Sequence, residues 1–254
     1  MACRSPVPTD NGVHGCGKCD FCLAKLRRFW LGRIAAEMHT SKLTWMVTAT
    51  YDEQHVDSGR SLPRDHWKVF LANLRRKHPC KQFSVGEYGT RTARPHWHGL
   101  IMFQDTVPDV PLGFDTINPF WKKGNSRWEV PRSVAGSISY LYDYFGKDNA
   151  EGGVKYGVSP GMGLRYLLNW ARLQARNRRF LTCPYGIRYT VPGVVKRSGG
   201  PWEYFIPFSS PYAVRMAEMY ILEWQALWDE KPDWAQLDRI NCDDPSALVD
   251  DIPR

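Results

Sequence analysis

Two β-rich segments separated by a short turn constrain the fold of this chain more than any other feature. Residues 83–88 and 96–104 both have strand signatures, and glycine and proline bound the segment 89–95 between them. A turn this short joins two strands as a hairpin, and hairpin strands are antiparallel. The sequence therefore predicts an antiparallel sheet that contains this pair of strands.

The remaining segments alternate between helix and strand signatures. Asp20 can cap a helix that runs to about His39, and Pro63 can open a second helix that runs to about Lys77. Further helices are predicted over about 132–147, 164–179 and 211–228, and further strands over 43–51, 127–130, 188–195 and 202–207, with 152–163 as flexible loop. This pattern predicts an α+β fold with a central antiparallel sheet flanked by helices.

The positive charge of the chain is concentrated before residue 229. The net charge is +8, but residues 229–254 contain eight acids and three bases, which leaves the first 228 residues at +13. A basic body of this kind favours a polyanionic partner, most simply nucleic acid, although many soluble proteins are mildly basic. We interpret residues 1–228 as a single domain, including an N-terminal cysteine segment (1–24), followed by an acidic tail (229–254) that keeps the C-terminus soluble.

Several classes of protein are excluded by the sequence. No segment approaches the roughly 20 apolar residues of a membrane span, and the polar N-terminus lacks the apolar core of a signal peptide, so we expect a soluble, unexported protein without a membrane partner. Gly12, Gly17 and Lys18 come close to a phosphate-binding loop, but Cys19 replaces the hydroxyl that such a loop places on magnesium. We therefore expect no built-in ATPase.

Four of the seven cysteines lie close to the N-terminus. Cys3, Cys16, Cys19 and Cys22 supply four thiolates, the number that tetrahedral zinc takes, and His14 could replace Cys3. Without an export signal, clustered cysteines favour a metal over disulfides, and no βαβ pattern supports a redox pair. The sequence predicts a structural zinc site here. The other three cysteines are expected to be small core residues or inert thiols: Cys80, Cys183 and Cys242.

The triplet His96-Trp97-His98 is the sharpest local feature. Residues two apart in a strand face the same way, so both imidazoles leave one face of the sheet while Trp97 packs on the other. Glu87 precedes His96 by nine residues, and the hairpin brings it almost opposite the two histidines. One carboxylate and two imidazoles could bind a cation and leave positions open for phosphate oxygens and water. The alternative is that the histidines are ordinary surface or core residues.

The predicted helix over 132–147 carries a second candidate set. Tyr140, Tyr144 and Lys147 follow an i, i+4, i+7 spacing and share one face, whereas Tyr142 lies about 200° around the helix from Tyr140. A phenol is a poor nucleophile, so it would need a metal-polarised phosphate or a nearby cation such as Lys147. The alternative is an aromatic stripe that packs into the core.

The order of these motifs resembles the replication initiators of microviruses, which are small single-stranded-DNA bacteriophages, within the His-hydrophobic-His (HUH) endonuclease superfamily. The resemblance spans about residues 1–165 and is carried by TWMVTATY (44–51), GEYG (86–89), RPHWH (94–98) and the tyrosine helix that includes Lys147. The segment CGKCDFC (16–22), which leads into a helix with tryptophan and arginine, is similar to the gokushovirus branch.

This resemblance implies a rolling-circle initiator that acts in the host bacterial cytoplasm. Such enzymes nick one DNA strand at the viral replication origin through a tyrosine that becomes linked to the 5′-phosphate, and they later rejoin the strand. The implied metal is Mg²⁺ or Mn²⁺, and the implied fold is an HUH, RRM-like sheet with the tyrosine helix beside it. The implied partners are single-stranded DNA, a host helicase and a host DNA polymerase. The implied metal ligands are His96, His98 and Glu87, and the implied catalytic residues are Tyr140 and Tyr144 with Lys147.

Two other functions remain open at this point. A non-catalytic, zinc-stabilised DNA-binding protein would explain the charge and the cysteines, but it would make the histidine and tyrosine sets accidental. A related HUH enzyme, such as a plasmid relaxase or a transposase, would share the chemistry and differ in the topology of its substrate.

Overall fold

The computed structural model of the chain forms two compact units. It describes residues 3–9, 12–16, 19–56, 61–89, 92–131, 133–134, 136–137, 155–179, 181, 186–196, 199–208, 210–230 and 232. We call Thr40–Met162 the sheet unit, and Met1–His39 together with Gly163–Arg254 the helical unit. The sequence predicted one domain over residues 1–228. Whether the two units fold as one domain stays a prediction, because compactness alone does not show independent folding.

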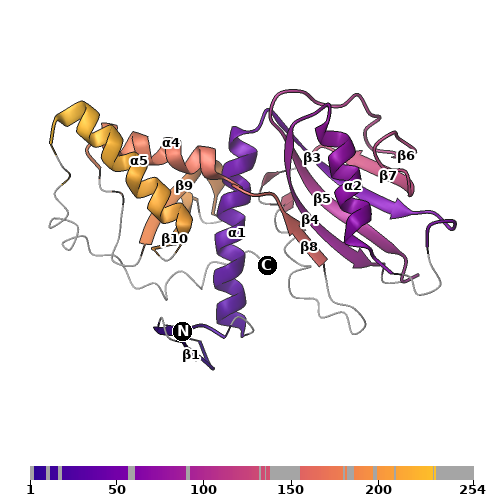
Figure 1. The fold of residues 1–254 in the computed structure, drawn as a ribbon, viewed down its shortest axis with the longest axis horizontal. Helices are drawn as coiled ribbons and strands as arrows, with labels where there is room; N and C mark the ends of the chain where they lie inside the picture. The colour runs from indigo at the N-terminus through magenta and orange to yellow at the C-terminus, as the bar shows by residue number, and fades with distance from the viewer. Residues whose placement is uncertain are drawn as a thin grey trace. The chain divides into compact units, whose positions relative to one another are not determined.

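The sheet unit is built on a six-stranded sheet (Figure 1). Its strands follow the order β6 (Asp115–Thr116), β7 (Gly124–Glu129), β3 (Leu43–Tyr51), β5 (Pro95–Phe103), β4 (Cys80–Tyr88) and β8 (Lys155–Val158). All five neighbouring pairs are antiparallel, which confirms the predicted α+β class and its antiparallel sheet. The predicted hairpin of β4 and β5 lies near the centre, and the Gly89 amide closes its turn by donating to the Arg94 carbonyl at 3.0 Å.

One face of this sheet is covered by α2 (Arg64–Arg75), which lies along it in Figure 1. The indole of Trp67 in α2 stacks on the indole of Trp97 in β5, with ring centroids 5.5 Å apart and an interplanar angle of 17°. The apolar residues that follow helical spacing in α2 are all buried, as the sequence predicted: Trp67, Phe70, Leu71 and Leu74. Because Trp97 packs beneath α2, its neighbours His96 and His98 must leave the opposite face.

Some strands form where the sequence contains no strand signature. Residues 152–163 were predicted to be flexible loop, and this prediction is wrong for β8, which pairs with β4 over four residues. The Ser159 amide extends that pairing by donating to the Gln82 carbonyl at 2.9 Å. The two-residue β6 and the three-residue strands β1 (Val7–Thr9) and β2 (Gly12–His14) were likewise not predicted. Such short segments become strands through their partners' hydrogen bonds rather than their own propensity.

The predicted tyrosine helix has a visible beginning. The Ser133 side chain accepts a hydrogen bond from the Gly136 amide at 2.9 Å, and the Ser133 carbonyl accepts one from the Ser137 amide at 3.0 Å. Both contacts are typical of a capped helix N-terminus. The helix therefore starts where the sequence placed it. Its candidate site residues lie outside the described residues: Tyr140, Tyr142, Tyr144 and Lys147.

The helical unit contains nearly all of α1 (Asp20–Thr40), α4 (Leu164–Arg176), α5 (Pro211–Trp228), and the hairpins β1–β2 and β9 (Gly186–Val195)–β10 (Pro201–Pro207). These helices and the second hairpin match their predicted ranges to within a few residues. Buried Glu37 of α1 accepts a hydrogen bond from the Gly163 amide at 2.7 Å, which fixes the start of α4 against α1. In the part of the chain that the structure describes, no helix combines the length and apolarity needed to cross a bilayer.

Gly99 offers a test of the packing between β5 and α2. A β-carbon at this position would lie 2.7 Å from Cζ2 of Trp67, within a stacked and buried pair that cannot move aside. We expect Gly99→Ala to lower the free energy of unfolding by about 1–3 kcal/mol in urea denaturation. Gly89→Ala is the control, because its β-carbon would meet nothing closer than 3.6 Å and should change stability little. Equal stabilities for the two variants would contradict this account of the packing.

Candidate functional site

The structure brings Glu87, His96 and His98 together on the face of the sheet that α2 does not cover. Glu87 of β4 lies directly opposite His96 of β5. Its Oε1 atom is 2.8 Å from Nε2 of His96 and 3.1 Å from Nε2 of His98. The two imidazole centroids are 4.8 Å apart. One ligand atom from each residue lies within 4.8 Å of the others, so the convergence predicted from the hairpin is present.

Hydrogen bonds on the far side of each imidazole orient the two rings. Nδ1 of His96 lies 3.0 Å from the Arg94 carbonyl, which can only accept, so Nδ1 carries a proton. Nδ1 of His98 lies 3.0 Å from Oγ1 of Thr48, the residue directly opposite it in β3. Both Nε2 atoms therefore point at Glu87, and this is the usual arrangement of metal-binding histidines whose second nitrogen is held by the protein.

The contact between the histidines and Glu87 needs a positive charge between the atoms. A carboxylate can only accept hydrogen bonds, so each Nε2 must either carry a proton or share a cation with Oε1. Burial acts to raise the pKa of Glu87, but the hydrogen bonds from His96 and His98 outweigh it and lower the pKa to about 2. Burial also lowers the pKa of His98, which favours the neutral ring that a metal ligand requires.

The donor set and its burial fit a divalent cation. Two imidazole nitrogens and one carboxylate on a single face form a three-ligand site with open positions, as in metal sites that take substrate or water. Glu87 and His98 are buried, whereas the His96 side chain is 16% exposed and gives the site an edge that solvent can reach. A substrate phosphate could therefore approach past His96.

Sequence reasoning did not single out the residues that hold the imidazoles. Thr48 lies within the segment 44–51, and it had been considered only as part of a strand. The signal was available once β3 is paired with β5, because a polar residue opposite His98 must share its face. The contribution of Arg94 is its backbone carbonyl, which residue type does not reveal.

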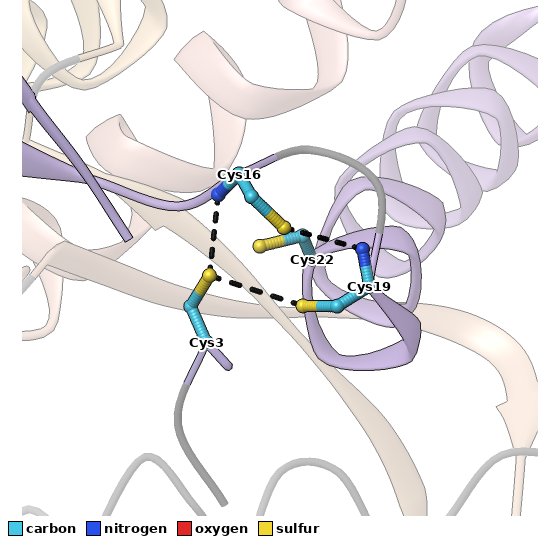
Figure 2. Close-up of side chains that lie close together, drawn as sticks. All are labelled: Cys3, Cys16, Cys19 and Cys22. Atoms are coloured by element: carbon cyan, nitrogen blue, oxygen red, sulfur yellow. Dashed lines mark hydrogen bonds between the residues drawn. The ribbon is translucent and has the colours of Figure 1, made fainter. Parts of the chain in front are cut away.

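The four N-terminal cysteines also converge (Figure 2). Each thiol lies within 4.8 Å of the others, and Figure 2 shows the four sulfurs turned toward one another at the start of α1. The Sγ atoms of Cys3 and Cys19 are 3.9 Å apart, which is too far for a disulfide and close to the roughly 3.8 Å between ligands of tetrahedral zinc. Because Cys3 is a member of this set, the four-thiolate site does not require His14.

Backbone amides favour the thiolate form within this cysteine set. The Cys16 amide donates to Sγ of Cys3 at 3.2 Å, and the Cys19 amide donates to Sγ of Cys16 at 3.3 Å. Hydrogen bonds from the amides of Cys22 and Arg4 lower the pKa of Cys19 to about 6, and the Cys16 amide lowers the pKa of Cys3. Thiolate is the form that binds metal, so the set fits structural zinc.

A family model matches the part of the chain that contains the histidine site. The model is that of the replication-associated protein ORF2/gene 2 protein, and it matches residues 44–149. This range includes Glu87, His96 and His98 as well as the predicted tyrosines. The cysteine set and most of the helical unit lie outside it.

Curated relatives extend the likeness over more of the chain. The replication-associated protein ORF4 of Chlamydia phage 1 is 26% identical over 213 residues, covering 71% of this chain and 52% of that protein. The replication-associated protein ORF2 of Spiroplasma virus 4 is 26% identical over 214 residues, covering 72% and 66%. The replication-associated protein VP4 of Bdellovibrio phage phiMH2K is 29% identical over 158 residues, covering 54% and 49%.

These matches confirm the resemblance to the replication proteins of microvirus-like phages that the motifs indicated. The aligned region spans between about half and two thirds of the length of these relatives. No solved structure matches the chain.

The cysteine set yields a direct test. We expect protein purified without chelator to contain about one zinc per chain by metal analysis, because four converging thiolates bind zinc tightly. Cys19→Ser should lose the zinc and expose the start of α1 to proteolysis. Cys80→Ala is the control, since that buried cysteine of β4 is not a member of the set and should leave zinc content unchanged. Zinc-free wild-type protein together with an unaffected Cys19→Ser variant would rule out the zinc site.

Proposed function

We propose that this chain initiates rolling-circle replication of a phage genome by nicking and rejoining single-stranded DNA at the origin. The observation that carries the proposal is the convergence of Glu87, His96 and His98 on one sheet face. This convergence lies inside the segment matched by a family of replication-associated proteins, and each reported relative bears that name. The proposed class is an HUH endonuclease with an RRM-like sheet.

The sheet residues would prepare the site for phosphate. A Mg²⁺ or Mn²⁺ ion held by Glu87, His96 and His98 would polarise the scissile phosphate. Thr48 and the Arg94 carbonyl keep both imidazoles turned toward that position, and Glu87 contributes the anionic ligand. The exposed edge of His96 leaves a path along which a DNA strand can approach.

The predicted tyrosines would supply the nucleophile. The phenolic oxygen of Tyr140 or Tyr144 attacks phosphorus, the bond from phosphorus to the 3′ oxygen breaks, and a 5′-phosphotyrosine ester forms. The phenolic proton goes to solvent, and the departing 3′ oxygen takes a proton, which frees a 3′-OH for synthesis. In the joining step a 3′-OH attacks the ester and releases the tyrosine. Lys147 would stabilise the developing phenolate or leaving-group charge.

The other parts of the chain would support this reaction. The cysteine set would hold a structural Zn²⁺ ion at the start of α1. Positive charge on residues 1–228 would attract single-stranded DNA and the viral origin. A host helicase and a host DNA polymerase in the bacterial cytoplasm would unwind and copy the template, since the sequence has no ATP-binding loop of its own.

A covalent-adduct assay tests this function. Wild-type protein is incubated with Mn²⁺ and labelled single-stranded DNA of the genome that encodes it, and the products are separated on a denaturing gel. We expect labelled DNA to migrate with the protein. His98→Ala should reduce the adduct by at least about two orders of magnitude, because the site loses one of three ligands. Binding in a native gel should persist, since phosphate contacts dominate affinity.

His78→Ala is the matched control, because His78 belongs to the same unit but contacts Thr106 rather than the site. Mass spectrometry of the adduct should identify Tyr140 or Tyr144, and DNA attached to Tyr142 would show that the helix has been misassigned. If DNA binds but no adduct forms, the non-catalytic DNA-binding alternative is correct. If only a different DNA topology is cleaved, the relaxase or transposase alternative is correct.

A further inference from the structure

The helix α4 has a buried face and an arginine-bearing face on opposite sides. Its buried residues all point to one side of the helix: Tyr166, Leu167, Ala171, Gln174 and Ala175. Arg165, Arg172 and Arg176 are seven and four residues apart, which places them within about 20° of one line along the opposite side. Arg165 is exposed, and the side chains of Arg172 and Arg176 are 43% and 60% exposed. We call these three residues the arginine stripe.

One carboxylate from α5 is shared by two members of the stripe. Oε1 of Glu223 lies 2.7 Å from Nε of Arg176, and its Oε2 lies 3.9 Å from Nε of Arg172. These ion pairs are at the surface, where such pairs contribute only about 0–1 kcal/mol to stability. Two guanidinium groups that share one carboxylate leave an excess of positive charge, and helix packing does not explain why it is there.

The charge of the whole helical unit points the same way. Residues 1–39 and 163–228 together contain 15 bases and six acids, whereas residues 40–162 contain 16 bases and 12 acids. The helical unit without its acidic tail thus carries +9 and the sheet unit +4. The larger share of the attraction for a polyanion comes from the unit that does not contain the histidine site.

We infer that the arginine stripe is a binding surface for the phosphate backbone of single-stranded DNA. Guanidinium groups bind phosphate through paired hydrogen bonds, and the stripe extends over about 16 Å, which is long enough to contact several phosphates of one strand. Glu223 competes with phosphate for Arg172 and Arg176 and so keeps the binding reversible. The identity of the ligand rests on the proposed function, but the contacts do not involve the nicking chemistry.

Salt-dependent binding of the full chain tests this inference. A labelled single-stranded oligonucleotide is titrated by fluorescence anisotropy at several NaCl concentrations, without Mg²⁺, Mn²⁺ or chelator, so that nicking does not contribute. Arg165→Gln combined with Arg176→Gln should weaken binding roughly ten-fold and reduce the slope of log K against log[salt] by about 1.4. Glu223→Gln should have the opposite sign and tighten binding several-fold.

The control removes two exposed positive charges from α2 instead, by Lys68→Gln combined with Arg76→Gln. This variant should lose much less affinity than the stripe variant, and circular dichroism should show that all variants remain folded. An equal loss in both double variants, or weaker binding by Glu223→Gln, would overturn the inference. Failure of the adduct assay with stripe-dependent binding intact would refute only the proposed function. Normal adduct formation with stripe-independent binding would refute only this inference.

Discussion

The register between β4 and β5 determines where every residue of the histidine site lies. Antiparallel pairing sets Glu87 opposite His96, and alternation of side chains sends Trp97 to the other face. A shift of one residue would exchange these faces and place a carboxylate beneath α2. Close packing on the α2 side holds the register, because a β-carbon at Gly86 would lie 3.0 Å from the Trp97 ring. The tryptophan layer therefore supports the metal ligands from the opposite face of the sheet.

The two units divide the proposed work between them. The segment matched by the replication-associated family falls within the sheet unit, and it includes the site where phosphate chemistry would occur. The helical unit holds the cysteine set and the arginine stripe, which concern folding and attraction of the strand rather than bond breakage. Reactivity and affinity can then be altered by different substitutions, as the adduct and anisotropy experiments require.

Much of the fold and of the site could be predicted from the sequence, because local patterns set them. The hairpin and the two-residue period placed Glu87 beside the histidines, and the spacing of the cysteines indicated their convergence. The sequence could not reveal β8, since that strand exists through hydrogen bonds from β4. It also could not reveal that Thr48 orients His98, because that contact depends on which strand pairs with β5. The positions of Tyr140 and Tyr144 stay predictions.

The central claim is that Glu87, His96 and His98 bind one divalent cation, and anomalous diffraction from crystals soaked in Mn²⁺ tests it most directly. The account predicts a single manganese peak between Oε1 of Glu87 and the Nε2 atoms of both histidines, at about 2.0–2.3 Å from each. It also predicts that Nδ1 of His98 still faces Thr48. The absence of a peak, with Glu87 still in direct hydrogen bonds to both imidazoles, would show that the three residues form only a buried polar cluster.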